Sequence, residues 1–428
     1  ILGTDQVDMD RAEDRELFDE ALENCKILRP KGGTVYTSEE AKEIANKLKY
    51  PVLVRPSYVL GGQGMAIAYD DNDVDRLISD INEVTQEHPI LVDKYMMGKE
   101  MEVDAISDGE DVLIPGVMEL LERAGIHSGD SISVYPTSVV EQKYIDIIID
   151  YTKRIAKELH IVGLFNIQFI ICEGEVYIIE VNPRASRTIP YISKVTGLPV
   201  IDVATRVILG EKLKDMDYGT GIYKKSKYVA VKMPIFSFQK LKNADTSLGP
   251  EMKSTGEVLG VSKHFSEAIL KAFIASGINV VERGKILVTV NDKDKPEILP
   301  IIKKLVKQGY SIYATSGTAI YLNEHGVENV ESVPKIWEGT DSIPDLIHSG
   351  KLSFIINTPT KGKEANRDGF KIRRLAAESK VPCFTAIDTV IGFYDAIAKG
   401  LKEEDLELVN IGEIWYNIGI AIWWNFMK

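Results

Sequence analysis

Three short stretches of this 428-residue chain carry side chains that could handle a phosphate and a metal ion. The first runs from Asn166-Ile-Gln168 through a turn to Ile179-Glu180-Val-Asn182-Pro-Arg184. Gln, Glu and Asn offer hard oxygen atoms, which suit Mg²⁺ held by few protein ligands together with substrate phosphates. The pattern predicts a metal site on a β-hairpin. The alternative is an edge hairpin whose polar side chains face solvent.

The length of the turn sets the register of this hairpin. A three-residue loop at 173–175 pairs Cys172 with Val176, which places Gln168 opposite Glu180 on one face. Asn182 follows two residues later on the same face. A two-residue loop would turn Gln168 to the other face, because side chains alternate along a strand. The metal-site interpretation therefore predicts the three-residue loop.

The second stretch, Val54-Arg55-Pro-Ser-Tyr-Val-Leu-Gly-Gly-Gln-Gly64, joins a strand to a glycine-rich loop. Backbone N–H groups of such a loop can approach phosphates closely, although the Gly-Lys-Ser/Thr ending of a Walker loop is absent. A plain hairpin is the alternative. We expect Arg15, Arg55 and Arg184 to converge on a transferring phosphoryl group as bidentate donors. Each arginine taken alone fits a surface ion pair equally well.

The third stretch, 118–130, ends a strand in carboxylates before the small polar turn Ala-Gly-Ile-His-Ser-Gly-Asp. His127 in this turn is either a phosphate contact or a structural histidine. Upstream, residues 10–25 show helical spacing, and Thr37 with Glu40 predicts a capping box that opens a helix through Lys49.

The pattern of apolar and polar residues changes near residue 277. Short apolar strands then alternate with helical segments such as 296–308 and 365–379, which predicts a parallel sheet with helices on both faces. We therefore expect two domains, 1–276 and 277–428. Turns after three of these strands carry donors for a phosphate monoester, and the second of these turns, 315–318, opens a helix. Ordinary loop residues are the alternative. The candidate effector-site donors are Thr289, Lys295, Thr315, Thr318, Lys335, Asn357 and Thr360.

Composition limits the function classes. Apolar residues make up 44 % and charged residues 27 %, without a run of about 18 apolar residues, so we expect no membrane partner. The formal net charge of −13 argues against nucleic acid. Cys25, Cys172 and Cys383 are few and far apart, as in reduced cytoplasmic proteins. Because the chain begins at Ile1, we expect it to be a piece of a longer protein.

Several segments together resemble the ATP-grasp fold, and more narrowly the large chain of carbamoyl-phosphate synthetases. They are RAEDRELF, VRPSYVLGG, AGIHSGDS, NIQF, IIEVNPRASRT and LGPEMKSTGEV, which span nearly all of residues 5–265. The second domain resembles the methylglyoxal-synthase-like domain that ends the same chains. The fold implied is α/β: an α+β ATP-grasp fold followed by a doubly wound parallel sheet.

The resemblance implies the second synthetase half, a ligase that phosphorylates carbamate with ATP and Mg²⁺ or Mn²⁺. It also implies a glutaminase small chain as partner in the full enzyme, a nucleoside monophosphate effector, and service to pyrimidine and arginine biosynthesis. The implied catalytic residues are Arg184, Arg15 and Asn182, and the implied metal ligands are Gln168, Glu180 and Asn182. The implied ATP-binding residues are Arg15, Arg55, Asp93, Met96, Glu100, Gly125, Ile126, His127, Ser128, Gln168 and Glu180.

The sequence departs from the family pattern at a few positions. Gln63-Gly64 stands where Arg-Ala is expected. Ser316 and Ala230 stand where ornithine-binding members have a histidine and a glutamate, which predicts weak ornithine binding, although Glu122 and Asp130 remain. Two other functions are open: a carboxylase-like ATP-grasp ligase, and a nucleotide-sensing module with an inert ATP-grasp part.

Overall fold

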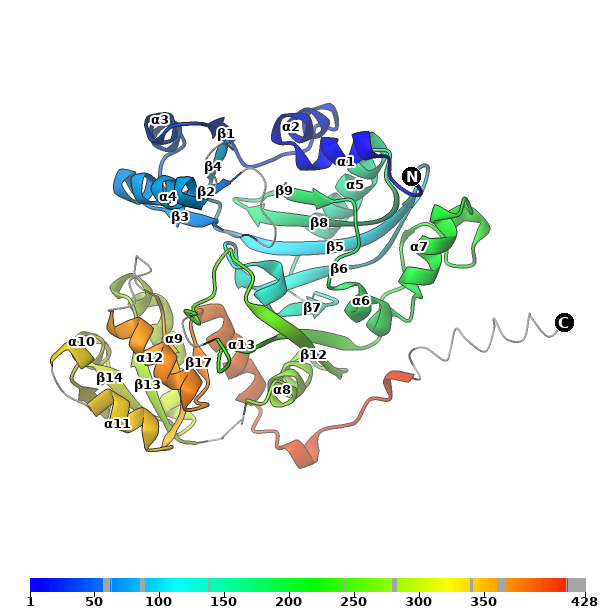
Figure 1. Ribbon diagram of the computed structural model, residues 1–428. Coiled ribbons are helices and arrows are strands. Elements are labelled where there is room, and N and C mark those ends of the chain that lie inside the picture. The colour runs from blue at the N-terminus through cyan, green and yellow to red at the C-terminus, as the bar shows by residue number, and fades with distance from the viewer. Residues whose placement is uncertain are drawn as a thin grey trace. The chain divides into compact units, whose positions relative to one another are not determined.

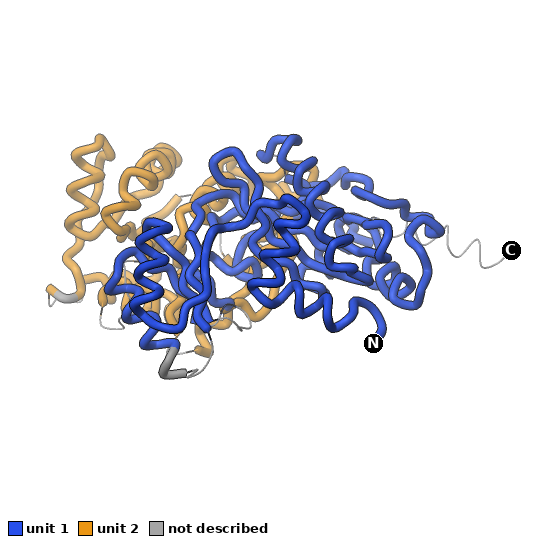
Figure 2. Tube along the Cα trace, turned by 90° about the horizontal axis from the view of Figure 1, so that it is seen from above, with its two compact units in different colours: residues 1–230, 249–252, 408–428 blue, residues 231–248, 253–407 orange. Residues whose placement is uncertain are grey.

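A computed structural model describes residues 1–414 of the chain, apart from 57–61, 63, 85–88, 138, 242–243, 279–282, 339–341, 360–366 and 413. The chain divides into two compact units, drawn in different colours in Figure 2. Unit 1 comprises residues 1–230, 249–252 and 408–428, and unit 2 comprises 231–248 and 253–407. The predicted domain boundary at 276/277 stays a prediction. No helix among the described residues is long and apolar enough to cross a membrane.

Unit 1 contains a small antiparallel sheet with two helices packed on it (Figure 1). The strand order is β1-β4-β2-β3, and the bounds are Gly32–Val35 (β1), Val52–Pro56 (β2), Ala66–Ala68 (β3) and Ile90–Lys94 (β4). The helices are Ser38–Leu48 (α3) and Asp71–Val84 (α4). The predicted capping box of α3 is confirmed, since Thr37 accepts from the N–H of Glu40 while Glu40 accepts from the N–H of Thr37.

The larger sheet of unit 1 holds the long strands in the order β7-β6-β5-β8-β9, with β10 parallel to β6. Their bounds are Lys99–Asp108 (β5), Val112–Arg123 (β6), Ser133–Tyr135 (β7), Val162–Cys172 (β8), Glu175–Asn182 (β9) and Gly221–Ile222 (β10). One face packs against the helices Gln6–Glu13 (α1), Arg15–Asn24 (α2) and Gln142–Glu158 (α5) in a single apolar core. Helices Ile189–Thr196 (α6) and Val200–Ile208 (α7) pack against a second cluster that includes Ile106 and Leu113.

The single helix expected over residues 10–25 is instead two helices, α1 and α2. Asp14 separates them, because its carboxylate accepts from the N–H groups of Glu16 and Leu17 and so caps a new helix. Arg15 is consequently the first residue of α2.

Unit 2 contains a five-stranded, fully parallel sheet in the order β15-β14-β13-β16-β17. Its strands are Lys285–Thr289 (β13), Ser311–Thr315 (β14), Val330–Val333 (β15), Leu352–Asn357 (β16) and Cys383–Phe384 (β17). The accompanying helices are Lys295–Lys307 (α9), Ser316–Glu324 (α10), Ser342–His348 (α11), Asp368–Glu378 (α12) and Ile387–Ile397 (α13). Strands Val229–Phe236 (β11) and Ser254–Ser262 (β12) are neighbours, and helix Phe265–Ala275 (α8) packs on β12.

Helices cover both faces of this parallel sheet, as the sequence predicted. On one face, Ile343 of α11 and Ile372 of α12 share a core with Leu287 of β13. On the other, Phe393 of α13 lies edge-on to Phe354 of β16, with ring centroids 5.0 Å apart. In chain order the strands read 3-2-1-4-5, so the order reverses between β13 and β16. Ligands of open parallel sheets bind beyond the carboxyl ends of the strands at such a reversal.

Candidate functional site

The β8–β9 hairpin brings the predicted metal ligands together. Gln168 pairs with Glu180 and Asn166 pairs with Asn182 across the antiparallel ladder. The loop, however, is not the predicted one: Cys172 pairs with Glu175, so the turn contains only Glu173 and Gly174, both with positive φ. That geometry suits a two-residue hairpin turn. The expected three-residue loop is therefore wrong, although the expected pairing of Gln168 with Glu180 is present.

A β-bulge reconciles the short turn with this pairing. The register shifts between Phe169, which pairs with Ile178, and Gln168, which pairs with Glu180, so Ile179 is an extra residue on β9. A regular strand would place Val176, Ile178, Glu180 and Asn182 on one face. The extra residue allows the first two to enter the core while the last two face Gln168. Val181, which is buried, resumes the apolar face.

Polar contacts tie the end of this hairpin together. The side-chain amide of Asn182 donates to Glu180 Oε1 at 2.9 Å, and Arg184 Nη2 donates to Asn182 Oδ1 at 3.1 Å. Gln168 Nε2 donates to Ser128 Oγ at 2.9 Å, which leaves the carbonyl oxygen of the Gln168 amide available as a ligand. Glu180 and Arg184 are exposed, so this edge can receive a ligand from solvent.

Strand β5, which pairs with β8 in the same sheet, carries buried carboxylates next to the hairpin. Asn166 Nδ2 donates to Glu102 Oε1 and to Asp104 Oδ1, each at 2.9 Å, and the Thr188 hydroxyl contacts both carboxylates. Glu100, on the same strand, accepts from the N–H of Gly125 at 3.4 Å. Burial raises the pKa of Glu100 to about 8; the Gly125 N–H opposes this rise, and the charges of Glu180 and Glu102 add to it.

The hard oxygens at the end of the hairpin fit a divalent cation. Gln168, Glu180 and Asn182 present amide and carboxylate oxygens from one end of a hairpin, and oxygen ligands are those that Mg²⁺ prefers. The described residues contain no cluster of three or more His, Cys, Asp or Glu side chains arranged to hold a metal by themselves. A cation at this hairpin would therefore depend on the amide oxygens and on oxygens of a bound phosphate.

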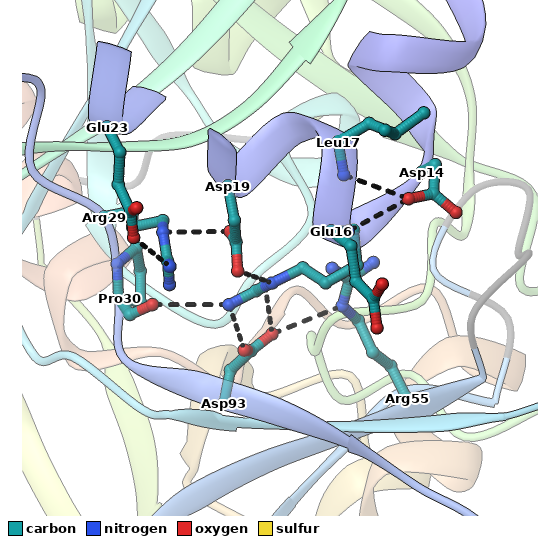
Figure 3. Close-up of polar contacts among 10 residues, drawn as sticks. Asp14, Glu16, Leu17, Asp19, Glu23, Arg29, Pro30, Arg55 and Asp93 are labelled. Atoms are coloured by element: carbon teal, nitrogen blue, oxygen red, sulfur yellow. Dashed lines mark hydrogen bonds and ion pairs between the residues drawn. The ribbon is translucent and has the colours of Figure 1, made fainter. Parts of the chain in front are cut away.

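The predicted arginines do not all lie on one group. Arg15 and Arg55 both contact Asp93. Figure 3 shows the dashed line from Arg55 to that carboxylate. Arg15 Nη2 forms an ion pair with Asp93 Oδ1 at 2.9 Å, Arg15 Nη1 donates to Asp93 Oδ2 at 3.2 Å, and Arg55 Nε lies 3.5 Å from Asp93 Oδ2. Arg184 instead contacts Asn182. In this state the carboxylate of Asp93 holds the two arginines that we expect to contact phosphate.

The turn after β6 holds four more of the predicted nucleotide residues, Gly125, Ile126, His127 and Ser128, whereas Met96 lies between β4 and β5. His127 Nδ1 accepts from the N–H of Gly129 at 3.0 Å, so its Nε2 carries the proton when the ring is neutral. The N–H of His127 donates to Gly249 O at 2.9 Å, which attaches the LGPEM segment to this turn. Gly125 has a φ of +96°, and a Cβ there would lie 2.8 Å from the Tyr95 hydroxyl, so only glycine fits. Met96 and Ile126 are partly buried.

The glycine-rich loop lies largely outside the described residues, which include only Gly62 and Gly64 of the stretch 57–64. A Cβ on Gly62 would lie 2.1 Å from Pro250 O. This close backbone approach, together with the positive φ of +72°, accounts for the glycine.

The second predicted site lies at the strand-order reversal of unit 2. Thr289 ends β13 and Asn357 ends β16; the two residues are paired, and Asn357 Nδ2 donates to Thr289 Oγ1 at 3.2 Å. Thr315 and Thr318 are buried at the start of α10, with their hydroxyls 3.5 Å apart. The order of strands therefore brings together donors from three turns.

The two lysines and the last threonine of this candidate site differ in placement. Lys295 Nζ donates to Gly317 O at 2.8 Å and forms an ion pair with Asp292 at 2.6 Å, so it lies at the N-terminal end of α10. Lys335 is partly buried after β15. Thr360 lies outside the described residues.

Sequence reasoning missed three supporting groups. Arg373 of α12 donates to Asn357 Oδ1 at 2.7 Å and grips both oxygens of Asp245 at 2.7 Å. Asp19 forms ion pairs with both Arg15 and Arg29. The Asn166–Thr188 cluster holds the β5 carboxylates. Only the last had a signal, the recurrence of acidic residues at even positions along an apolar strand, Glu100 to Asp104.

Two family models match the chain. Residues 14–216 match the ATP-binding domain of the carbamoyl-phosphate synthase L chain, and residues 297–385 match the MGS-like domain. Carbamoyl phosphate synthase large chains are also similar in sequence. That of Lachnoclostridium phytofermentans is 54 % identical over 414 residues, which cover 97 % of this chain and 39 % of the relative. That of Agathobacter rectalis is 56 % identical over 403 residues, covering 94 % and 37 %. The chain thus spans about two fifths of the length of these relatives.

Solved structures share the fold of about two thirds of the chain. The biotin carboxylase domain of Hydrogenobacter thermophilus 2-oxoglutarate carboxylase, solved with MgADP, ADP and bicarbonate, has 18 % identity and a TM-score of 0.53, over 64 % of this chain and 67 % of that one. The biotin carboxylase of Campylobacter jejuni has 17 % identity and a TM-score of 0.52, over 64 % and 68 %. With the family matches, they confirm the predicted fold class, an ATP-grasp fold followed by a parallel-sheet domain.

Proposed function

Because this chain belongs to the carbamoyl phosphate synthase large-chain family over the two fifths of that length that it spans, we propose that it phosphorylates carbamate with ATP, giving carbamoyl phosphate and ADP. It would be the C-terminal part of the large chain, the second synthetase half with its effector domain. The order of the two family matches supports this assignment. In the complete cytoplasmic enzyme, a glutaminase small chain would supply ammonia, and the product would serve pyrimidine and arginine biosynthesis.

One observation carries this proposal: Glu180 and Asn182 face the Gln168 side of the hairpin, with Arg184 donating to Asn182 at its end. These three oxygen ligands would hold Mg²⁺ or Mn²⁺, which when bound offsets the charge of the phosphates. In the transfer, a carbamate oxygen forms a bond to the γ-phosphorus, the bond from that phosphorus to the β–γ bridging oxygen breaks, and ADP leaves.

The chain's own residues position and neutralise the reacting groups. Arg15, Arg55 and Arg184 offer planar donors that match the oxygens of a phosphoryl group better than lysine would. Burial raises the pKa of Glu100 to about 8, which favours its protonated form in this state. A protonated carboxyl can both donate to and accept from a ribose hydroxyl.

The reverse reaction tests the proposal directly. The full chain, supplied with carbamoyl phosphate, ADP and Mg²⁺, should form ATP, measured by coupled luminescence. ATP formation should stop when carbamoyl phosphate is omitted. A folded chain that binds ATP yet forms none from carbamoyl phosphate would contradict the proposed reaction and favour the nucleotide-sensing alternative.

We also propose that unit 2 binds a nucleoside monophosphate, with its phosphate at the N-terminus of α10. Thr289 and Asn357 at the strand-order reversal, Thr315 and Thr318 at the start of the helix, and Lys295 beside it support this. Exposed N–H groups and the helix dipole favour a dianion there. By family resemblance, UMP is the first choice and IMP the second.

Calorimetry on the full chain distinguishes the ligands. UMP or IMP should bind, and Lys295→Met should weaken that binding because a charge-assisted contact of about 1.5–3 kcal/mol is lost. Lys303→Met is the matched control, because it removes an exposed charge from α9, the helix that also carries Lys295. Ornithine should bind weakly. Tight ornithine binding, or no nucleotide binding by the unaltered chain, would contradict this assignment.

A further inference from the structure

Arg15 begins a series of three consecutive ion pairs that the proposed reaction does not require. Asp19, one turn along α2, accepts from Arg15 Nε at 3.1 Å through Oδ2, and its Oδ1 forms an ion pair with Arg29 Nε at 3.0 Å. Arg29 in turn pairs with Glu23 at 3.1 Å. Figure 3 shows Asp19 next to Arg29, which in turn lies next to Glu23. Each carboxylate oxygen of Asp19 therefore serves a different arginine.

Helix stability does not account for the position of Arg15. As the first residue of α2, Arg15 places a positive charge where the helix dipole favours a negative one. The charge is tolerated because carboxylates surround it: Asp19 lies one turn away, and Asp93 faces the guanidinium from β4. With a side chain only 14 % exposed, Arg15 is held in a defined orientation rather than extended into solvent.

The two carboxylates use different nitrogens of the guanidinium. Asp93 takes Nη1 and Nη2, whereas Asp19 takes Nε. Asp93 is also shared with Arg55, so it divides its charge between two cations. A phosphate that binds Arg15 bidentately must compete for the Nη groups. It can displace Asp93 from them without disturbing the bond from Nε to Asp19.

We propose that Asp19 is a positioning residue that keeps Arg15 oriented for phosphate, that Arg29 fixes Asp19, and that Asp93 is the partner which phosphate replaces. This inference rests on the proposed function, because it takes Arg15 as a phosphate ligand. The competing explanation is that Asp19 only stabilises α2 through an i,i+4 ion pair, which is worth a few tenths of a kcal/mol in a helix.

The test is the affinity of the full chain for MgATP, measured by calorimetry. Asp19→Asn keeps the size of the side chain but removes its charge, so the Kd of MgATP should rise roughly tenfold, as when a group that orients a ligand is lost. Glu20→Gln removes the same charge from the next residue of α2, which is exposed and has no ion-pair partner among the described residues, and should leave the Kd unchanged. Arg29→Gln should give a smaller rise than Asp19→Asn.

A double-mutant cycle separates positioning from general stabilisation. In an Arg15→Met background, Asp19→Asn should cause no further rise in the Kd, because Asp19 acts through Arg15. The melting temperature is recorded for each variant. An equal rise in both backgrounds, or an unchanged Kd with a lowered melting temperature, would overturn the inference alone. Failure of the unaltered chain to bind MgATP would overturn the proposed function as well.

Discussion

Glu180 illustrates how one side chain can matter for chemistry and little for folding. It is exposed on β9, beyond the bulge, and its described partner is the neighbouring Asn182. We expect Glu180→Gln to leave the melting temperature nearly unchanged and to abolish ATP formation from carbamoyl phosphate. The lost charge should remove several kcal/mol of transition-state stabilisation, roughly a thousandfold in rate. The luminescence assay at saturating Mg²⁺ measures this loss.

Glu175→Gln is the matched control for that experiment. It removes the same charge from the same strand, at the exposed end next to the turn. Its rate should equal that of the unaltered chain. Near-normal turnover in Glu180→Gln would show that the metal ligands lie elsewhere.

At the level of single residues, the candidate metal ligands could be predicted from the sequence, whereas the residues that hold other site residues in place could not. Hard-oxygen side chains at 168, 180 and 182 could be recognised because their types are unusual on apolar strands. Asp19 and Arg373 could not, because a charged residue on a helix surface is common. Their partners, Arg15 and Asp245, come together only in the folded chain.

Among the elements, the β8–β9 hairpin shows where pattern reasoning fails. Counting from an assumed loop gave the correct partner for Gln168 by an incorrect route, because a shorter turn and a bulge cancel each other. The sequence did contain a signal: the apolar positions of β9 shift phase between Ile178 and Val181. A phase shift within a strand indicates an inserted residue, and weighing it would have predicted the bulge.

Strand β1 pairs with β4, the strand that carries Asp93, and its packing against Asp93 can be tested. Gly32 pairs with Asp93, and a Cβ on Gly32 would lie 1.8 Å from Asp93 Oδ1 and 2.8 Å from Val92 O. We expect Gly32→Ala to lower stability by about 1–3 kcal/mol through overpacking and to disturb the contacts of Asp93 with both arginines. Thermal unfolding and the Kd of MgATP are the measurements.

The neighbouring glycine is the control for this prediction. A Cβ on Gly33 would meet only Ile44 Cδ1, at 2.8 Å, and the end of an isoleucine side chain can move. Gly33→Ala should therefore be the milder change. Equal effects of the two substitutions would mean that Asp93 does not depend on the space left by Gly32.

For the molecule as a whole, stability should depend on an ion pair within unit 2. Burial by itself raises the pKa of Asp245, but the hydrogen bonds and charge of Arg373 outweigh it, so the net pKa is lowered. A lowered carboxyl pKa contributes stability above the unfolded value, about 3.9, and this stability is lost as pH falls through the folded pKa. We expect Asp245→Asn to cost about 2 kcal/mol at pH 7.

The pH dependence of this loss of stability tests the ion pair more directly than its size at pH 7. The difference in unfolding free energy between the unaltered chain and Asp245→Asn should shrink below about pH 4, because protonation then removes the same charge from Asp245. Glu328→Gln, an exposed position in unit 2, should show no such difference. A gap that persists at low pH would mean that the ion pair is not its source.

The chain alone should not make carbamoyl phosphate from glutamine, bicarbonate and ATP. It carries one match to the ATP-binding domain, and no described contact joins Cys25, Cys172 or Cys383 to a histidine that could activate it for releasing ammonia. Radiolabelled bicarbonate should therefore yield no labelled product. Labelled product from the purified chain would overturn this expectation.

The central position of β13 also orders events during synthesis. Its neighbour β14 and the helix α10 that follows β14 emerge soon after it, whereas its other neighbour, β16, emerges only after β14 and β15. The bond between Thr289 and Asn357 closes a separation of 68 residues. Closing long loops is entropically costly and slow. A nascent chain therefore contains the N-terminus of α10 well before it contains Asn357, and effector binding must await the later strands.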